Sequence, residues 1–107
     1  MSDQIAPPVK ALLIFFDATD RLGDESLLEA IVRELAKHHI AGATAIHGIM
    51  GYGVHRRIHR KGLFGVIDDK PVTLIAVDNE QKLRSVVPVI RPMIKEGLLV
   101  MLDAEVL

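Results

Sequence analysis

The segment of residues 48–62, GIMGYGVHRRIHRKG, combines three glycines with a dense block of basic side chains. Glycine lets a backbone turn sharply and present its N–H groups to a ligand without an intervening Cβ. Arginine and lysine supply positive charge and donors suited to phosphate groups. This combination predicts an anion site beside or inside a loop, with a solvated hairpin loop as the structural alternative. The candidate ligand-binding residues here are His47, Gly48, Met50, Gly51, Tyr52, Gly53, Arg56 and Arg57.

Two well-known nucleotide fingerprints do not fit this segment. A dinucleotide site requires Gly-x-Gly-x-x-Gly between a strand and an amphipathic helix. Here the glycines stand at 48, 51 and 53, and the residues that follow lack an adequate apolar face. The Gly-Lys-Ser or Gly-Lys-Thr of a Walker A loop does not occur either. A less specific nest of glycine N–H groups remains as the predicted anion site.

The histidines of the segment raise the question of a metal. His55 and His59 have the i, i+4 spacing of the zincin helix, but that motif requires Glu directly after the first histidine, and Arg56 stands there. The surrounding positive charge opposes a divalent cation, so no metal site is predicted and adventitious binding is the alternative. His47, between apolar neighbours, is interpreted either as a ligand contact or as a structural histidine.

A second candidate site is the loop of residues 17–24, DATDRLGD. Its carboxylates suit a metal, and Arg21 is a candidate anion donor. The same residue types are ordinary in turns and helix caps, and this structural interpretation is favoured. Elsewhere no nucleophile stands with an evident base, and no carboxylate pair is placed for acid–base work. No catalytic residue, and hence no enzyme, is expected.

Composition limits the class of protein. The 107 residues, 50% of them hydrophobic, predict one domain over 1–107. A formal charge of −1 gives no reason to bind nucleic acid or an acidic membrane. The absence of cysteine excludes disulfides and thiolate chemistry. The N-terminal residues lack a signal-peptide pattern, and no apolar run reaches the roughly 20 residues of a membrane helix, so a cytoplasmic protein is expected.

Hydrophobic periodicity predicts six main elements. Apolar runs predict strands over 9–16, 43–50, 71–77 and 98–102. A helical stripe at Leu27, Leu28, Ile31, Val32 and Leu35 predicts a helix capped by Asp24 and ended by Gly42.

A second helical stripe follows the third strand. It comprises Leu83, Val86, Val87, Ile90 and Ile94, with Asp78 as the predicted cap. Pro88 and Pro92 each remove a helical N–H, so a kink or break is expected near residue 87.

The order strand–helix–strand, repeated twice, predicts an α+β, ferredoxin-like βαββαβ two-layer sandwich. Its four antiparallel strands carry both helices on one face. Yet Leu12, Ile14 and Phe16 alternate with residues 11, 13 and 15, which are also apolar. Because the face without helices would be a large apolar patch, we expect other copies of the chain to cover it in a closed ring.

Several phrases of the sequence resemble the DUF190 group of small bacterial and archaeal proteins: VKALLIFFDATDRLGD, ESLLEAIVREL, IAGATAIHGIMGYGVHRRIH and KEGLLVMLDAEVL. That group is PII-like, so the resemblance implies trimers of ferredoxin-like subunits that join through the sheet face. It also implies signalling: an adenine nucleotide (AMP, ADP, ATP or cyclic AMP) or a similar anionic effector would bind between subunits, with no required cofactor.

The same resemblance assigns parts of the chain. Residues 51–66 take the place of an effector-type loop that reaches a protein partner, with a membrane transport protein as one option, and residues 1–8 form a flexible tail. The basic loop that PII proteins place after the second helix has no counterpart here, because residues 95–97 lead directly into the last strand. Phosphate donors are therefore expected from Arg21, Arg56 and Arg57.

Two further functions stay open from the sequence. One is a CutA-like trimer that binds metal through His47, His55 or His59, or that serves as a scaffold. The other is an enzyme acting on a phosphorylated small molecule, which ranks last because no acid–base pair supports it.

Overall fold

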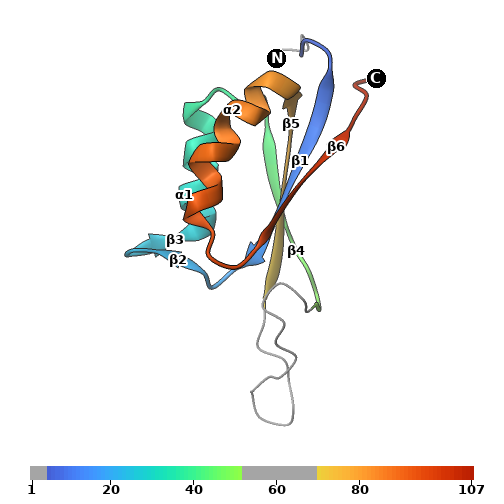
Figure 1. Cartoon of the computed structure of the whole chain (residues 1–107). Coiled ribbons are helices and arrows are strands. Elements are labelled where there is room, and N and C mark those ends of the chain that lie inside the picture. The colour runs from blue at the N-terminus through green and yellow to red at the C-terminus, as the bar shows by residue number, and fades with distance from the viewer. Residues whose placement is uncertain (1–4, 52–69) are drawn as a thin grey trace.

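The computed structural model describes residues 5–51 and 70–107. A four-stranded antiparallel sheet in the order β4-β5-β1-β6 carries both helices on one face (Figure 1). The ferredoxin-like prediction is therefore confirmed. An unpredicted hairpin, β2–β3, precedes the first helix. The elements are β1 (Val9–Asp17), β2 (Arg21–Leu22), β3 (Glu25–Ser26), α1 (Leu27–Lys37), β4 (Ala43–His47), β5 (Pro71–Asn79), α2 (Glu80–Ile90), a 3-10 turn (Arg91–Met93) and β6 (Leu98–Asp103).

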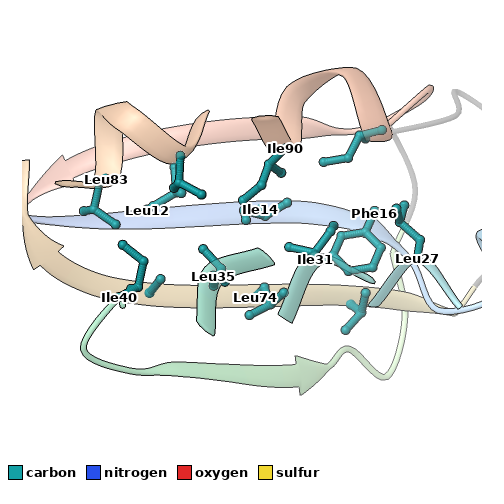
Figure 2. Packing of buried hydrophobic residues seen from close by; sticks show 14 residues of the cluster. Leu12, Ile14, Phe16, Leu27, Ile31, Leu35, Ile40, Leu74, Leu83 and Ile90 are labelled. Atoms are coloured by element: carbon teal, nitrogen blue, oxygen red, sulfur yellow. The ribbon is translucent and has the colours of Figure 1, made fainter. Parts of the chain in front are cut away.

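The core lies between the helices and the two central strands (Figure 2). Strand β1 pairs with β5 along its whole length, from Val9 opposite Asn79 to Asp17 opposite Pro71. Since side chains alternate along a strand, every second residue faces the helices. The largest core side chains are Leu12, Ile14, Phe16, Leu27, Ile31, Leu35, Leu74, Leu83 and Ile90.

Helix α1 begins and ends at other residues than predicted. Its cap is Ser26, whose Oγ accepts the N–H of Glu29 at 3.3 Å, because Asp24 lies in the turn of the β2–β3 hairpin beside Gly23 at φ +62°. The helix ends at Lys37 and not at Gly42. His39, in the left-handed region at φ 59°, follows its end.

The predicted stripe of α1 is also partly wrong. Val32 is 41% exposed, and Ala30 takes its place among the buried residues of the helix. The helix therefore turns a narrower apolar face to the sheet than the sequence pattern indicates.

Helix α2 is capped by Asn79, whose side chain accepts the N–H groups of Gln81 and Lys82 at 2.9 and 3.4 Å. The preceding Asp78, predicted as the cap, does not cap the helix, because its carboxylate accepts the N–H groups of Ala41 and Asn79. Of the kink or break predicted near residue 87, the break does not occur, because the helix continues through Pro88 to Ile90 and only then passes into the 3-10 turn. The missing N–H of Pro88 is tolerated within a helix that packs its apolar face against the sheet.

The opposite side of the sheet, here called the open face, carries no helix of the described chain (Figure 1). The register places Leu13 beside Ile75 on one strand and Val100 on the other. Most of these side chains are half-buried, and the outer ones are exposed. The open face is apolar, as the alternation in β1 predicts. It comprises Ala11, Leu13, Phe15, Thr44, Ile46, Thr73, Ile75, Val77, Leu98, Val100 and Leu102.

Two predicted boundaries concern the functional segments. Strand β4 ends at His47, earlier than the predicted 43–50, so the first glycines lie beyond the strand. Most of the predicted loop 51–66 lies outside the described residues. Within the predicted tail, the carbonyl of Pro8 accepts the N–H of Glu80 at 2.9 Å, and the carbonyl of Ala6 accepts Asn79 Nδ2 at 2.7 Å.

Candidate functional site

The end of β4, the start of β5 and the end of β1 meet at one end of the sheet. The N–H of Gly48 donates to the carbonyl of Pro71 at 2.8 Å. The N–H of Ala18 donates to the carbonyl of Lys70 at the same distance, 2.8 Å. The chain between Gly48 and Lys70, which carries the glycine and arginine segment, therefore leaves and re-enters the sheet at one place.

Asp17 is the buried acid of this region, with 7% of its surface exposed. Its Oδ2 accepts the N–H of Lys70 at 2.9 Å, and its Oδ1 accepts the N–H and the hydroxyl of Thr19 at 2.8 and 2.6 Å. These bonds join the end of β1 to the residue before β5. The favoured structural interpretation of residues 17–24 accounts for Asp17 and Thr19 in full.

Asp20 continues the same network towards α1. Its Oδ2 accepts the N–H of Asp17 at 3.1 Å, and its carbonyl accepts the N–H of Leu27 at 3.0 Å. Asp17 and Asp20 thus both accept backbone N–H groups. No group of three or more His, Asp or Glu side chains able to hold a metal occurs among residues 5–51 and 70–107.

Two glycines of the candidate segment pack against a proline ring. A Cβ added to Gly48 would lie 3.1 Å from Cγ of Pro71, and one added to Gly51 would lie 3.4 Å from the same atom. Position 48 therefore has a steric reason to be glycine, apart from any ligand. Neither glycine lies at a positive φ, so the backbone conformation by itself does not require glycine at these positions.

The structure brings part of the predicted ligand-binding set together. His47, Gly48, Met50 and Gly51 lie at the end of β4, and the first three are exposed. His47 pairs with Val72, which puts it on the side of the sheet that carries the helices. Outside the described residues lie Tyr52, Gly53, Arg56 and Arg57, as do His55 and His59.

Arg21 stands apart from this group, on the β2–β3 hairpin. Its guanidinium donates to the carbonyl oxygen of Asp24 within the same hairpin. Arg21 also borders a pocket of about 300 Å³ that sequence reasoning missed. The sequence feature that could have indicated this pocket is the pair of charged residues Lys95 and Glu96 directly before Gly97. The pocket is lined by Asp20, Arg21, Leu27, Met93, Lys95 and Glu96.

Gly97 directly follows two of the lining residues, Lys95 and Glu96, and has little space around it. A Cβ at this position would lie 2.5 Å from the carbonyl oxygen of Phe15 and 2.5 Å from Cγ2 of Ile94. Because the first of these is a backbone atom of the central strand, no other residue fits without moving the sheet. The turn before β6 is thereby held against β1.

A buried carboxylate also joins elements at the other end of the sheet. Asp78, 2% exposed, accepts the N–H groups of Ala41 and Asn79 at 2.8 and 2.6 Å and lies 3.0 Å from the ammonium of Lys82. Burial raises the pKa of Asp78, but the bonds from Asn79, Lys82 and Ala41 outweigh it, so the pKa lies below its ordinary value. Asp78 is thus a structural acid.

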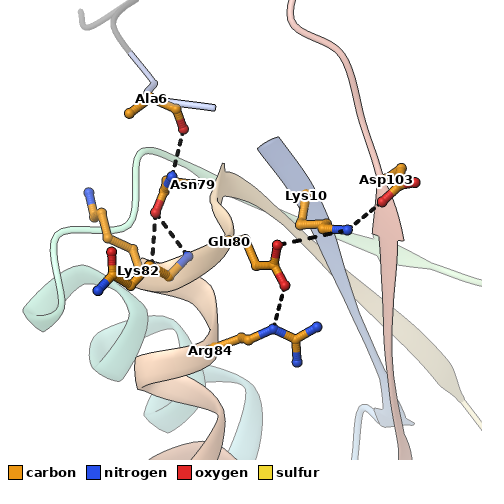
Figure 3. Close-up of polar contacts among 8 residues, drawn as sticks. Ala6, Lys10, Asn79, Glu80, Lys82, Arg84 and Asp103 are labelled. Atoms are coloured by element: carbon orange, nitrogen blue, oxygen red, sulfur yellow. Dashed lines mark hydrogen bonds and ion pairs between the residues drawn. The ribbon is translucent and has the colours of Figure 1, made fainter. Parts of the chain in front are cut away.

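Four charged side chains link β1, α2 and β6 near the same end (Figure 3). Glu80 Oε2 accepts Arg84 Nε at 2.6 Å, and Lys10 Nζ lies 3.9 Å from Glu80 Oε1 and bonds to Asp103. The hydrogen bond from Arg84 lowers the pKa of Glu80, and the one to Asp103 raises the pKa of Lys10. Since each acid is matched with a base, this cluster is structural.

Known structures share this arrangement of sheet, helices and strand order. The nitrogen regulatory PII-like protein CPII of Thiomonas intermedia K12, bound to ADP and bicarbonate, superposes with a TM-score of 0.68 at 20% identity, over 92% of this chain and 87% of CPII. A PII-like signaling protein of Thermus thermophilus gives 0.63 at 14% identity, over 92% and 89%. CutA1 of Pyrococcus horikoshii gives 0.59 at 18%, over 92% and 85%. The fold is therefore that of the PII-like proteins.

The sequence itself narrows this class. The profile of the DUF190 family, described as "Uncharacterized ACR, COG1993", matches residues 9–106. UPF0166 protein MJ1524 of Methanocaldococcus jannaschii is 33% identical over 98 residues, which are 91% of this chain and 90% of that protein. The chain belongs to the DUF190 family, as its resemblance indicates. Among the described residues, neither helix has the length and apolar character needed to cross a membrane.

Proposed function

We propose that this protein is a cytoplasmic PII-like regulatory protein that binds an adenine nucleotide, or a similar anionic effector, and catalyses no reaction. The observation that carries the proposal is the convergence of Gly48, Lys70 and Asp17 at one end of a PII-like sheet. These bonds bring Gly48 and Lys70, which flank most of the glycine and arginine segment, together at that end of the sheet. The structures of CPII bound to ADP support the proposal, because CPII has the same fold.

The proposed assembly is a homotrimer that buries the open face. Half-buried apolar side chains such as Leu13, Phe15 and Ile75 line this face, and Ile46 and Leu98 add exposed apolar surface at its margins. Burial of such area contributes roughly 25 cal/mol per Å². In a closed ring with rotational symmetry, every copy buries the same surface and no copy is left with an exposed interface.

The proposed nucleotide site lies between subunits, beside the end of β4. His47, Gly48, Met50 and Gly51 form its wall within one subunit. Tyr52 and Gly53, which follow Gly51 in the sequence, complete the proposed glycine-rich part of the ligand-binding set. The phosphates are bound by Arg56 and Arg57, with Arg21 as a further candidate donor, because guanidinium groups match phosphate oxygens in pairs.

Residues 51–66 would report the bound state to a protein partner. Binding of an anion orders a charged segment when new charge-assisted hydrogen bonds offset the conformational entropy that is lost. The partner recognises this segment, and a membrane transport protein is one such partner. No nucleic acid is involved, in keeping with the formal charge of −1.

Isothermal titration calorimetry with AMP, ADP, ATP and cyclic AMP tests the nucleotide proposal. We expect at least one nucleotide to bind below about 100 µM, and Arg56→Gln/Arg57→Gln to weaken it at least about tenfold, which is about 1.4 kcal/mol. Lys37→Gln, on the outer surface of α1, is the matched control and should bind as the parent does. If no nucleotide binds below about 1 mM, roughly −4 kcal/mol, the proposal fails.

A CutA-like role is the second candidate, and the fold shared with CutA1 favours it. Such a protein binds a divalent ion through His47, His55 or His59, or serves mainly as a scaffold. Metal analysis of protein purified without a histidine tag, compared with His55→Ala/His59→Ala, tests it. Equal metal content in both proteins would exclude these two ligands.

A further inference from the structure

The pocket beside the β2–β3 hairpin is built within a single subunit. Its lining residues come from the β2–β3 hairpin and the residue before it, the first residue of α1, the 3-10 turn and the turn that leads into β6. Figure 1 shows that the hairpin and the turn before β6 lie toward the same end of the molecule. Its volume of about 300 Å³ is at the lower end of the range for small-molecule sites, about 300–1,000 Å³. None of its lining residues belongs to the end of β4, although Arg21 is also a candidate phosphate donor of the proposed nucleotide site.

The charges of its lining are balanced. Arg21 and Lys95 are cationic, Asp20 and Glu96 are anionic, and each of the four has an exposed or half-buried side chain. The ammonium of Lys95 makes no hydrogen bond or ion pair with any residue of the described chain. Asp20 accepts the N–H of Asp17, and both Asp20 and Glu96 have further partners in the protein. A carboxylate offers about four acceptor positions, so it can accept bonds from more than one partner.

The remaining lining is apolar. Both Leu27, a buried core residue, and Met93, a half-buried and adaptable side chain, line the pocket. Such a surface favours a short carbon chain over water.

The walls of the pocket are held in place from both sides. Glu25 and Arg33 join the hairpin to α1 through a two-oxygen ion pair of 2.6 and 2.7 Å, and Arg21 is bonded to the carbonyl of Asp24. The turn that carries Lys95 and Glu96 is held against β1 by the close approach of Gly97 to Phe15. Pre-organised walls reduce the entropy that a ligand must offset on binding.

We propose that this pocket binds a zwitterion of the size of a free amino acid. A ligand of one charge would be attracted by one pair of side chains and repelled by the other, whereas a ligand with both charges is matched by all four. Arg21 and Lys95 bind its carboxylate, Asp20 and Glu96 bind its ammonium, and its side chain contacts Leu27 and Met93. Because these charges face solvent, the affinity is weak, about 0.1–5 mM.

Saturation-transfer difference NMR with a panel of free amino acids tests the proposal directly. We expect at least one amino acid to bind in this range. Its N-acetyl derivative, which lacks the ammonium, and its amide, which lacks the carboxylate, should each bind at least about tenfold more weakly. The proposal is overturned if no amino acid binds at about 20 mM, or if either derivative binds as well as the parent compound.

Substitutions then locate the site. Lys95→Gln and Glu96→Gln should each weaken binding at least about tenfold, whereas the control Lys37→Gln should leave it unchanged. Thermal unfolding confirms that the Lys95 variant is folded, which is expected because this ammonium has no partner to lose in the described chain. Unchanged binding in both variants would overturn the assignment to this pocket. The nucleotide titrations are independent of this assay, so either proposal can fail while the other holds.

Discussion

The carboxylate of Asp17 accepts the backbone N–H of Lys70 at 2.9 Å, although 53 positions separate the two residues in sequence. The same carboxylate holds Thr19, and the neighbouring Ala18 bonds to the carbonyl of Lys70. One side chain therefore closes the turn after β1 and aligns the start of β5. The arrangement of the chain at the end of the sheet beside the candidate site therefore depends on Asp17.

Replacement of Asp17 by alanine should destabilise the fold. It leaves the N–H groups of Thr19 and Lys70 without their acceptor in a largely buried place, which costs about 2–4 kcal/mol in the free energy of unfolding. Asp17→Asn keeps one acceptor oxygen and should lose less. Urea denaturation measures both. Asp24→Ala, an exposed acid of the hairpin turn, is the control and should stay within about 0.5 kcal/mol of the parent. Equal losses at positions 17 and 24 would contradict the role of Asp17.

Stability should fall in acid because of Asp78. Its folded pKa is below the ordinary value of 3.8, so the unfolded state binds more protons between the two values and stability rises with pH there. The contribution is complete above about pH 4 and is lost as pH falls through the lower, folded pKa. Urea denaturation between about pH 2 and 6 should show this slope.

The variant Lys82→Gln tests the cause of that shift. Loss of the ammonium 3.0 Å from Asp78 raises the folded pKa towards the ordinary value, so the acid-dependent part of the stability becomes smaller. Lys37→Gln, whose ammonium pairs at 3.5 Å with Glu34 on the surface, should leave the slope unchanged. An identical slope in all three proteins would show that Lys82 does not hold the pKa of Asp78 down.

Gly97 should tolerate no side chain. In Gly97→Ala the new Cβ meets the carbonyl oxygen of Phe15 at 2.5 Å, so β6 must shift, at a cost of about 1–3 kcal/mol in the free energy of unfolding. Gly42→Ala is the matched control, because nothing lies within 4 Å of its Cβ and its φ is not positive. That variant should be neutral or up to about 1 kcal/mol more stable. Thermal unfolding ranks the two variants, and a neutral Gly97→Ala would refute the close approach.

The open face should control assembly. Ile75→Asp places a charge among the apolar side chains of this face and should dissociate the proposed trimer, since burial of an unpaired carboxylate is strongly unfavourable. Size-exclusion chromatography with light scattering measures the mass. Val32→Asp changes an equally apolar residue on the outer side of α1 and should remain trimeric. Monomeric parent protein, or a trimeric Ile75→Asp variant, would refute the proposed interface.

The residues with strong periodicity could be assigned from the sequence. Leu12, Ile14 and Phe16 of the predicted first strand are buried, and so is the stripe of Leu83, Val86 and Ile90 in α2, because apolar side chains that recur at the period of the element gather on one face. The predicted caps were wrong by one or two residues. Asp24 and Asp78 are good caps locally, but the first lies in a hairpin turn and the second bonds to Ala41, a distant residue.

The candidate site could be predicted only in part. The glycines and arginines of residues 48–62 are conspicuous in sequence, but the predicted strand 43–50 runs past the observed end of β4 at His47. The steric demand of Pro71 on Gly48 could not be predicted, since it depends on how β4 lies against β5. The pocket of Arg21 and Lys95 was missed for the same reason, because its walls come from segments near opposite ends of the chain.

Sequence alone thus determined the class of fold, the two apolar faces of the sheet and the family, because each depends on local patterns of residue type. The tertiary structure decided which acids are structural. In the sequence, Asp17 and Asp20 are equally plausible metal ligands. In the structure, the carboxylate oxygens of Asp17 accept the N–H groups of Thr19 and Lys70. A carboxylate takes its role from the donors that the fold brings to it, and those donors come from distant parts of the chain.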